Sequence, residues 1–167
     1  MILHMKKFCL LIASVLCYIS ITSFDIYSCG TSEGTTSQLN VSMNASKDAK
    51  AYVDLAFSDY LGADSYYAML SRAYGKVERK GELKDACMRF IAARGTYQVT
   101  FNPQKDASAC ILYRIWDYHT MAEMVIRDII WQYKDMGKHE SLYRVVNILE
   151  GELEGEWLQK MLKKYSY

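Results

Sequence analysis

The chain has a single proline in 167 residues and only three histidines. Proline interrupts helices because its ring fixes φ and it lacks a backbone N–H, so its near absence favours helical structure. Hydrophobic residues make up 51% of the chain and aromatic residues 13%, which is enough apolar surface for one core. We therefore expect an all-α protein, a small bundle of four to five helices.

The chain also lacks an excess of charge of either sign. Its formal net charge is +1, and removing Lys6, Lys7 and Asp25 with the first 28 residues leaves 18 basic and 18 acidic residues. A balanced charge produces no overall field that would attract nucleic acid or an anionic membrane surface. We expect no nucleic-acid partner.

Motifs of the common catalytic and cofactor sites are missing as well. The sequence contains no GxSxG, HExxH, phosphate-binding glycine loop or CxxC pair. The nearest approach to a metal motif is His119 with Glu123, one helical turn apart, but two ligands do not make a zinc site. A hydrogen-bonded imidazole is the simpler interpretation of His119. We expect no metal, no cofactor and no enzymatic activity.

What the chain does have at its start is a secretory signal peptide, predicted over residues 1–28. A short basic segment precedes an apolar run at 8–24, which has the length of a signal core rather than of a membrane span. The residues around Cys29 resemble a bacterial lipobox, which would make Cys29 the lipidated first residue. Asp25 and Tyr27 depart from that pattern, so an ordinary cleaved signal with soluble secretion is the alternative. Both interpretations place the protein outside the inner membrane, either in the periplasm or as a membrane-anchored lipoprotein.

The segment behind Cys29 predicts a flexible tether over residues 29–46. It is rich in glycine, serine and threonine and almost uncharged, a composition that cannot bury a core. The helical domain is then expected to occupy residues 47–167.

Cysteine use leaves one candidate disulfide. Five cysteines become three after cleavage, and lipidation of Cys29 would leave Cys87 and Cys110. An even pair in an oxidising compartment is a disulfide candidate. Two buried free thiols are the equally open alternative.

Apolar periodicity and glycine breaks predict the helices of the domain. Ser46 and Asp64 are the expected N-caps of the first two helices, and Gly62, Gly81 and Gly137 are the expected breaks. The alternating segment 96–100 is too short to outweigh the helical context. The predicted helices span residues 47–61, 64–80, 82–95, 106–136 and 139–164, and the fourth, apolar on more than one face, is expected to be central.

Two charged sets are interpreted first as solvated surface. The acidic set could also meet a basic partner. The basic set is Arg72, Lys76, Arg79, Lys80 and Lys84, and the acidic set is Glu150, Glu152, Glu154 and Glu156.

One local pattern resembles a known family. The segments LSRAYGKV (70–77) and LKDACMRFIAARG (83–95) are similar to the two-helix signature of the LprI-like lysozyme-inhibitor family. That signature is Leu-Asn-x-x-Tyr-x-x-Leu followed by Leu-x-x-Ala-Gln-x-x-Trp-Ile-x-x-Arg-Asp. Ser71, Cys87 and Gly95 depart from it, as does phenylalanine in place of tryptophan. The family-motif positions in this sequence are Leu70, Tyr74, Leu83, Ala86, Phe90 and Arg94.

The resemblance implies a non-catalytic envelope protein that binds and inhibits a lysozyme-type muramidase. Lysozymes use carboxylates in a groove, so such an inhibitor would work by occluding that groove. The alternative is an envelope interaction or assembly lipoprotein, either pilotin-like or a toxin-immunity protein, with a protein partner. The aromatic content suits an interface and suits a core equally well, and an exposed aromatic patch would favour a binding role.

Overall fold

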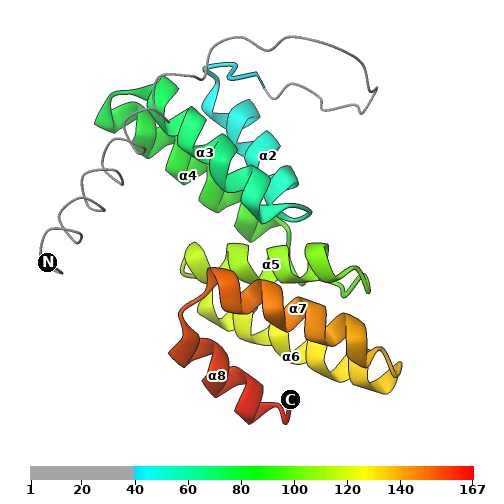
Figure 1. Cartoon of the computed structure of the whole chain (residues 1–167). Helices are drawn as coiled ribbons and strands as arrows, with labels where there is room; N and C mark the ends of the chain where they lie inside the picture. Colours follow the sequence, from blue (N-terminus) through cyan, green and yellow to red (C-terminus); the bar gives the residue numbers. More distant parts are fainter. Residues whose placement is uncertain (1–39) are drawn as a thin grey trace, which may run out of the picture. The chain divides into compact units, whose positions relative to one another are not determined.

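The computed structural model describes residues 40–167, and this part of the chain is all-helical, with seven helices and no strand (Figure 1). The prediction of an all-α protein is thereby confirmed. The helices are α2 (Ala45–Ala56), α3 (Tyr60–Tyr74), α4 (Val77–Ala93), α5 (Pro103–Ile115), α6 (His119–Asp135), α7 (His139–Glu152) and α8 (Gly155–Lys164).

The described residues, 40–167, belong to one compact unit. The unit contains its own hydrophobic core, so it is expected to fold independently of the preceding residues. Within the described part, no helix combines the length and the apolar character needed to cross a bilayer. The predicted signal peptide (1–28) and the predicted lipidation site Cys29 lie outside the described residues.

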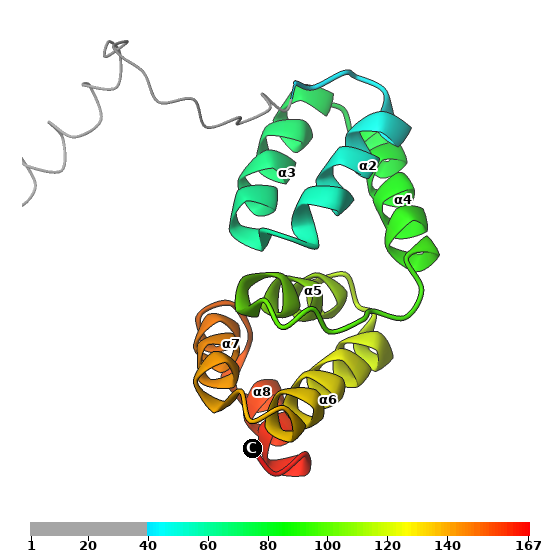
Figure 2. The same cartoon turned by 90° about the vertical axis from the view of Figure 1, so that its right-hand side faces the viewer.

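The helices pack as two groups, α2–α4 and α5–α8, and α5 contacts helices of both groups. In the first group α2 packs against both α3 and α4, and in the second α5 packs against α6 and α7, while α8 contacts both of those helices. α5 also contacts α2 and α3, which joins the groups. Figures 1 and 2 show α5 between the α2–α4 group and the helices that follow it.

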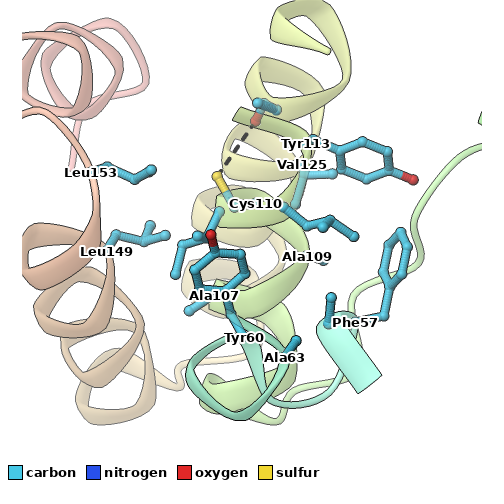
Figure 3. Packing of buried hydrophobic residues seen from close by; sticks show 14 of the residues in the cluster. Phe57, Tyr60, Ala63, Ala107, Ala109, Cys110, Tyr113, Val125, Leu149 and Leu153 are labelled. Carbon is cyan, nitrogen blue, oxygen red and sulfur yellow. Dashed lines mark hydrogen bonds between the residues drawn. The ribbon is translucent and has the colours of Figure 1, made fainter. Parts of the chain in front are cut away.

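α5 is the central helix of the unit. Every residue from Asp106 to Tyr113 is buried, because helices of both groups surround it. Figure 3 shows side chains of the first group, Tyr60 and Ala63, on one side of α5, and Leu149 of α7 on another. The sequence predicted a central helix over 106–136, and only its first part has this position.

The two groups begin with the same sequence. The pattern Val-x-x-Asn-x-x-Lys-Asp-Ala-x-Ala occurs at 41–51 and again 58 residues later, at 99–109. A second shared pattern, Gly-Lys-x-Glu, stands at the start of the third helix of each group, at 75–78 and 137–140. The domain is therefore an internal duplication of a three-helix unit, with α8 added, and we call α2–α4 the first repeat and α5–α7 the second.

The shared sequence forms the same capping structure in both repeats. An asparagine caps the helix, Asn44 in α2 and Asn102 in α5, and each side chain accepts a hydrogen bond of 3.1 Å from the lysine amide three residues on. The residue before it has a left-handed backbone in both cases, with φ of 58° at Met43 and at Phe101. A positive φ is uncommon outside glycine, so its recurrence at equivalent positions supports the duplication.

In each repeat, hydrogen bonds to a buried aspartate of the first helix hold the chain before that helix and the end of the second helix. Asp48 accepts hydrogen bonds from the amide and hydroxyl of Ser42 (2.9 and 2.8 Å) and from the hydroxyl of Tyr74 at the end of α3 (2.8 Å). Asp106 accepts the equivalent bonds from Thr100 (2.9 and 2.8 Å) and from Tyr133 of α6 (2.6 Å). Each carboxylate thus fixes the chain before its own helix and the end of the next helix.

Seven helices replace the predicted five because both long segments are broken. The segment 106–136 is interrupted after Ile115, where Asp117 has φ of 62° and the amide of Tyr118 donates to the carbonyl of Tyr113 (2.8 Å). This turn contains no glycine or proline. It lets α6 fold back along α5, so that both helices bury their apolar faces.

The predicted helix 139–164 is broken at Leu153. Its backbone is extended (φ −114°, ψ 153°), and its side chain enters the core. The break allows α8 to turn back and cover α6 and α7 with Leu158, Met161 and Leu162. A straight helix would have carried these apolar residues into solvent.

Helix boundaries in the first repeat also differ from the prediction. α3 begins at Tyr60 with Asp59 as its cap, and not at Asp64, and it ends at Gly75, whose φ is +60°. Gly81, the predicted break, lies inside α4. α2 is capped by Asn44 rather than by Ser46.

Candidate functional site

Trp131 of α6 is a large aromatic side chain that is 56% exposed. The ring of Tyr165, just after α8, lies against it at a right angle, with 6.2 Å between the ring centroids. On the same helix the Arg127 guanidinium lies 5.3 Å from the Trp131 ring centroid. Trp131 is therefore exposed but held in place by two neighbours.

Tyr165 is itself fixed by Glu123. Its hydroxyl donates to Glu123 Oε1 (2.7 Å), and the same oxygen accepts a hydrogen bond from Lys164 Nζ (2.5 Å). The hydrogen bonds from Lys164 and then from Tyr165 lower the pKa of Glu123 below its ordinary value. Burial, followed by the bond to the carboxylate, raises the pKa of Tyr165. At neutral pH this arrangement keeps the carboxylate charged and the phenol protonated.

The last residues of the chain continue this surface toward α7. Lys134 Nζ donates to the backbone carbonyl of Ser166 (2.6 Å), and the amide of Tyr167 donates to the carbonyl of Leu162 (3.0 Å). Tyr167 is 48% exposed and Tyr143 of α7 is 59% exposed. The pKa of Tyr167 is raised by burial and then by the charges of Glu150 and Tyr143.

Two of these aromatic residues, Trp131 and Tyr165, line an open groove of about 590 Å³. We call Trp131, Tyr143, Tyr165 and Tyr167 the C-terminal aromatic surface. The groove itself is lined by Trp131, Gln132, Lys134, Asp135, Tyr165 and Ser166. An exposed aromatic surface with a polar rim is typical of a protein-binding site.

Sequence reasoning missed this surface. Trp131 lies off the buried stripe of α6, which is formed by Ile126, Ile129, Ile130 and Tyr133. A large aromatic residue outside the buried stripe was the available signal. Its pairing with Tyr165 depends on the return of α8, which was not predicted.

The residues that carry the family resemblance are mostly structural. Leu70, Tyr74, Leu83 and Ala86 are buried, and Tyr74 is the residue that donates to Asp48. Burial and the hydrogen bond to that carboxylate raise the pKa of Tyr74. These four side chains are therefore explained by packing within the first repeat.

Arg94 and Phe90 are the two motif residues that reach the surface. Arg94 forms an ion pair with Asp54, and its guanidinium lies 4.8 Å from the ring centroid of Phe57. Phe90 and Arg94 line a groove of about 320 Å³ between α2 and α4, together with Lys50, Val53, Asp54 and Ala93.

Cys87 and Cys110 are both buried and carry free thiols, so the structure contradicts the candidate disulfide. The reason is the duplication, which places them in the cores of different repeats. Cys110 faces α6, and its sulfur lies 3.7 Å from the carbonyl oxygen of Ala122, the contact dashed in Figure 3. Burial raises the pKa of each thiol to about 12, which makes both unreactive at neutral pH.

His119 and Glu123 do not converge on a common point. His119 Nδ1 accepts a hydrogen bond from Arg114 (2.9 Å), whereas Glu123 is engaged by Lys164 and Tyr165. Within residues 40–167 there is no group of three or more His, Cys, Asp or Glu side chains that could hold a metal ion.

The two charged sets lie at two different turns. The basic set surrounds the turn between α3 and α4, and the acidic set surrounds the turn between α7 and α8. Glu150, Glu154 and Glu156 are exposed, and a nitrogen of Arg114 lies 4.0 Å from Glu154.

Comparison with protein-family models, with curated proteins and with solved structures found no match to this chain. The candidate surface is therefore assigned from its own geometry.

Proposed function

We propose that this protein is a non-catalytic envelope protein that binds a protein partner through its C-terminal aromatic surface. The observation that carries the proposal is the exposed Trp131, supported by Tyr165 and bordered by a groove. This corresponds to the interaction or assembly alternative from the sequence. Secretion, with or without lipidation at Cys29, is part of the proposal and depends on the sequence of residues 1–29.

The rigidity of the surface supports a binding role. Tryptophan and tyrosine are enriched among the residues that contribute most to protein interfaces. Here Tyr165 is positioned by Glu123 and Lys164 before any partner arrives. A side chain that is already ordered loses less conformational entropy on binding.

The use of the buried carboxylates supports the non-catalytic part of the proposal. Asp48 and Asp106 are the buried acidic side chains of the described unit. Both accept several hydrogen bonds from side chains and amides that close the repeats. Their role in the fold is sufficient to account for their burial.

The test is site-specific photo-crosslinking in cells that express the protein. A crosslinker at position 131 should give a discrete adduct with one protein, and a crosslinker at position 61 should not. Leu61 is the matched control because it is an apolar residue of α3 with the same exposure of 56%.

The partner identified in this way is then titrated against purified variants. Trp131→Ala should weaken its affinity about thirtyfold, the loss of about 2 kcal/mol expected at the centre of an interface, and Leu61→Ala should leave it unchanged. Equal adducts at both positions, or an unchanged affinity of Trp131→Ala, would exclude this surface as the binding site.

Inhibition of a lysozyme-type muramidase is the second proposal, and the acidic α7–α8 turn favours it. Exposed Glu150, Glu154 and Glu156 form a local negative patch that complements a basic enzyme. Such an inhibitor would cover the groove that holds the catalytic carboxylates.

This second proposal is tested by titrating the chain from residue 30 onward into peptidoglycan hydrolysis by several lysozymes. Stoichiometric inhibition that is weakened in Glu154→Lys/Glu156→Lys but unchanged in Trp131→Ala would support it. Full lysozyme activity at micromolar excess of folded protein would eliminate the proposal for the enzymes tested.

A further inference from the structure

The turn between α3 and α4 carries a concentration of cations that pair with no carboxylate of the described residues. Residues 72–84 contain five basic and two acidic side chains. We call Arg72, Lys76, Arg79 and Lys80 the basic tip. In the described part of the chain none of these four forms an ion pair with a carboxylate. Three of them are exposed, and Arg79 packs over the ring of Tyr74 at 5.3 Å.

An aliphatic side chain stands among these cations. Val77 is 83% exposed, the highest value for a large hydrophobic residue in the described part of the chain. It is the first residue of α4 and directly follows Lys76. Cations around an exposed apolar residue are the combination that attracts a protein to an anionic bilayer and lets it insert a side chain.

The equivalent turn of the second repeat has a different use for its lysines. Lys134 donates to the carbonyl of Ser166, and Lys138 lies 5.3 Å from the ring centroid of Phe101. The duplicated fold therefore does not require free cations at this position. Their accumulation in the first repeat needs another explanation.

The position of the basic tip in the chain supplies one. Tyr74, two residues before Lys76, donates to Asp48, which in turn holds Ser42 near the start of the described chain. Figures 1 and 2 show the start of the coloured chain and the α3–α4 turn at the same end of the first repeat. A lipid at Cys29 would thus hold the protein by the end that carries the basic tip.

From these observations we infer that the basic tip is a membrane-docking surface for anionic phospholipid headgroups. Arg72, Lys76, Arg79 and Lys80 supply the electrostatic attraction, and Val77 enters the headgroup region. The orientation that results leaves the C-terminal aromatic surface, on the other repeat, free for a protein partner. The inference rests on the proposed envelope location but not on the identity of the partner.

The experiment measures partition of the chain from residue 30 onward, without lipid, onto vesicles with and without 30% phosphatidylglycerol. We expect binding to the anionic vesicles only, weakening as salt shortens the screening length. Each surface cation contributes about fivefold to such a partition coefficient, so Arg72→Gln/Lys76→Gln/Lys80→Gln should reduce it about a hundredfold.

A matched control removes three charges elsewhere. Lys105→Gln/Lys160→Gln/Lys163→Gln changes the net charge by the same amount at exposed positions away from this turn, and it should retain most of the binding. Equal losses in the two triple variants would show that net charge alone is responsible and would overturn the inference. So would equal partition onto neutral vesicles.

An acidic protein partner is the competing occupant, and the same variants separate it. Soluble polyglutamate that binds the wild type, with no vesicle binding, would overturn the membrane assignment. Crosslinking at position 131 in the tip variant reports on the proposed function separately, because that variant leaves the C-terminal aromatic surface unchanged.

Discussion

α2 and α5 start with the same capping sequence, but a face that is exposed to solvent in α2 is buried in α5. α2 presents Lys50 and Asp54 to solvent, where they form an ion pair (2.5 Å). The equivalent residues of α5, 58 positions later, are Ser108 and Leu112, and both are completely buried. The difference shows that two things determine the sequence of such a helix. One is the cap that starts it, and the other is the set of neighbours that pack against its second face.

The second face of α5 is where the repeats meet. The backbone amide of Tyr60 donates to Ser108 Oγ (3.0 Å), and Trp116 Nε1 donates to the hydroxyl of Tyr52 (2.8 Å). Tyr113 contributes a further bond, to the carbonyl of Gly95 (3.0 Å). The charged residues of α2 therefore face solvent, whereas the apolar and hydroxyl groups of α5 form the contact between the two repeats.

Exchanging residues between these equivalent positions should give the largest effect. Leu112→Asp puts the α2 residue into α5 and buries an unpaired carboxylate, so we expect a loss of at least about 4 kcal/mol of unfolding free energy. The reverse exchange, Asp54→Leu, removes only surface ion pairs and should change stability by less than about 1 kcal/mol. Urea denaturation followed by circular dichroism measures both.

Similar losses in the two variants would contradict this comparison. That result would mean that α2 and α5 have equivalent environments, contrary to the burial of Leu112.

The two buried aspartates provide a second, finer comparison. Asp106 accepts bonds from three hydroxyls, those of Tyr97, Thr100 and Tyr133, and from one amide. Asp48 accepts from two hydroxyls and one amide. Asparagine has the same shape but would point an N–H₂ group at donors. We expect Asp106→Asn to cost about 3 kcal/mol and Asp48→Asn about 1 kcal/mol less, the contribution of one hydrogen bond.

Chemical denaturation of both variants tests the order. If Asp48→Asn were as damaging as Asp106→Asn, the extra bond from Tyr97 would contribute nothing. Tyr97→Phe is the direct check, because in this background Asp106→Asn and Asp48→Asn should lower the unfolding free energy by the same amount.

The helical class was predictable from the sequence because proline is nearly absent and the apolar periodicity is strong. The break at Asp117 was not, since the turn contains no glycine or proline and only the packing of α6 on α5 favours it. Gly81 was assigned as a stop by a local rule, but a glycine within a helix costs only about 1 kcal/mol. The actual stop, Gly75, has the positive φ that favours glycine there.

The duplication was visible in the sequence but required comparing two distant segments. The first segment, 41–51, begins in the stretch interpreted as a tether and continues into the first predicted helix, and Asn44 and Asp48 look there like ordinary polar residues. The candidate surface was harder to predict from the sequence, because Trp131 and Tyr165 are 34 positions apart and meet only through the break at Leu153. A contact that depends on an unpredicted turn cannot be read from periodicity.

The smallest effect concerns the attachment of α8, which has no counterpart in the first repeat. Hydrogen bonds from Lys164 and Tyr165 lower the pKa of Glu123 below its ordinary value of 4.5. The stabilisation is therefore complete above pH 4.5 and is lost as the pH falls through the lowered pKa. The pKa of Lys164 is raised above 10.5 by its bond to Glu123, so its contribution is complete below pH 10.5 and is lost as the pH rises through the raised value.

Glu123→Gln should remove the acid-side decrease in thermal stability, and the change should be smaller than that of either aspartate variant because solvent screens the pair. Glu140→Gln, which removes an exposed carboxylate paired with Arg144 on α7, is the control. If the two variants had the same pH profile of melting temperature, the contact between Glu123 and α8 would not hold the helix in place.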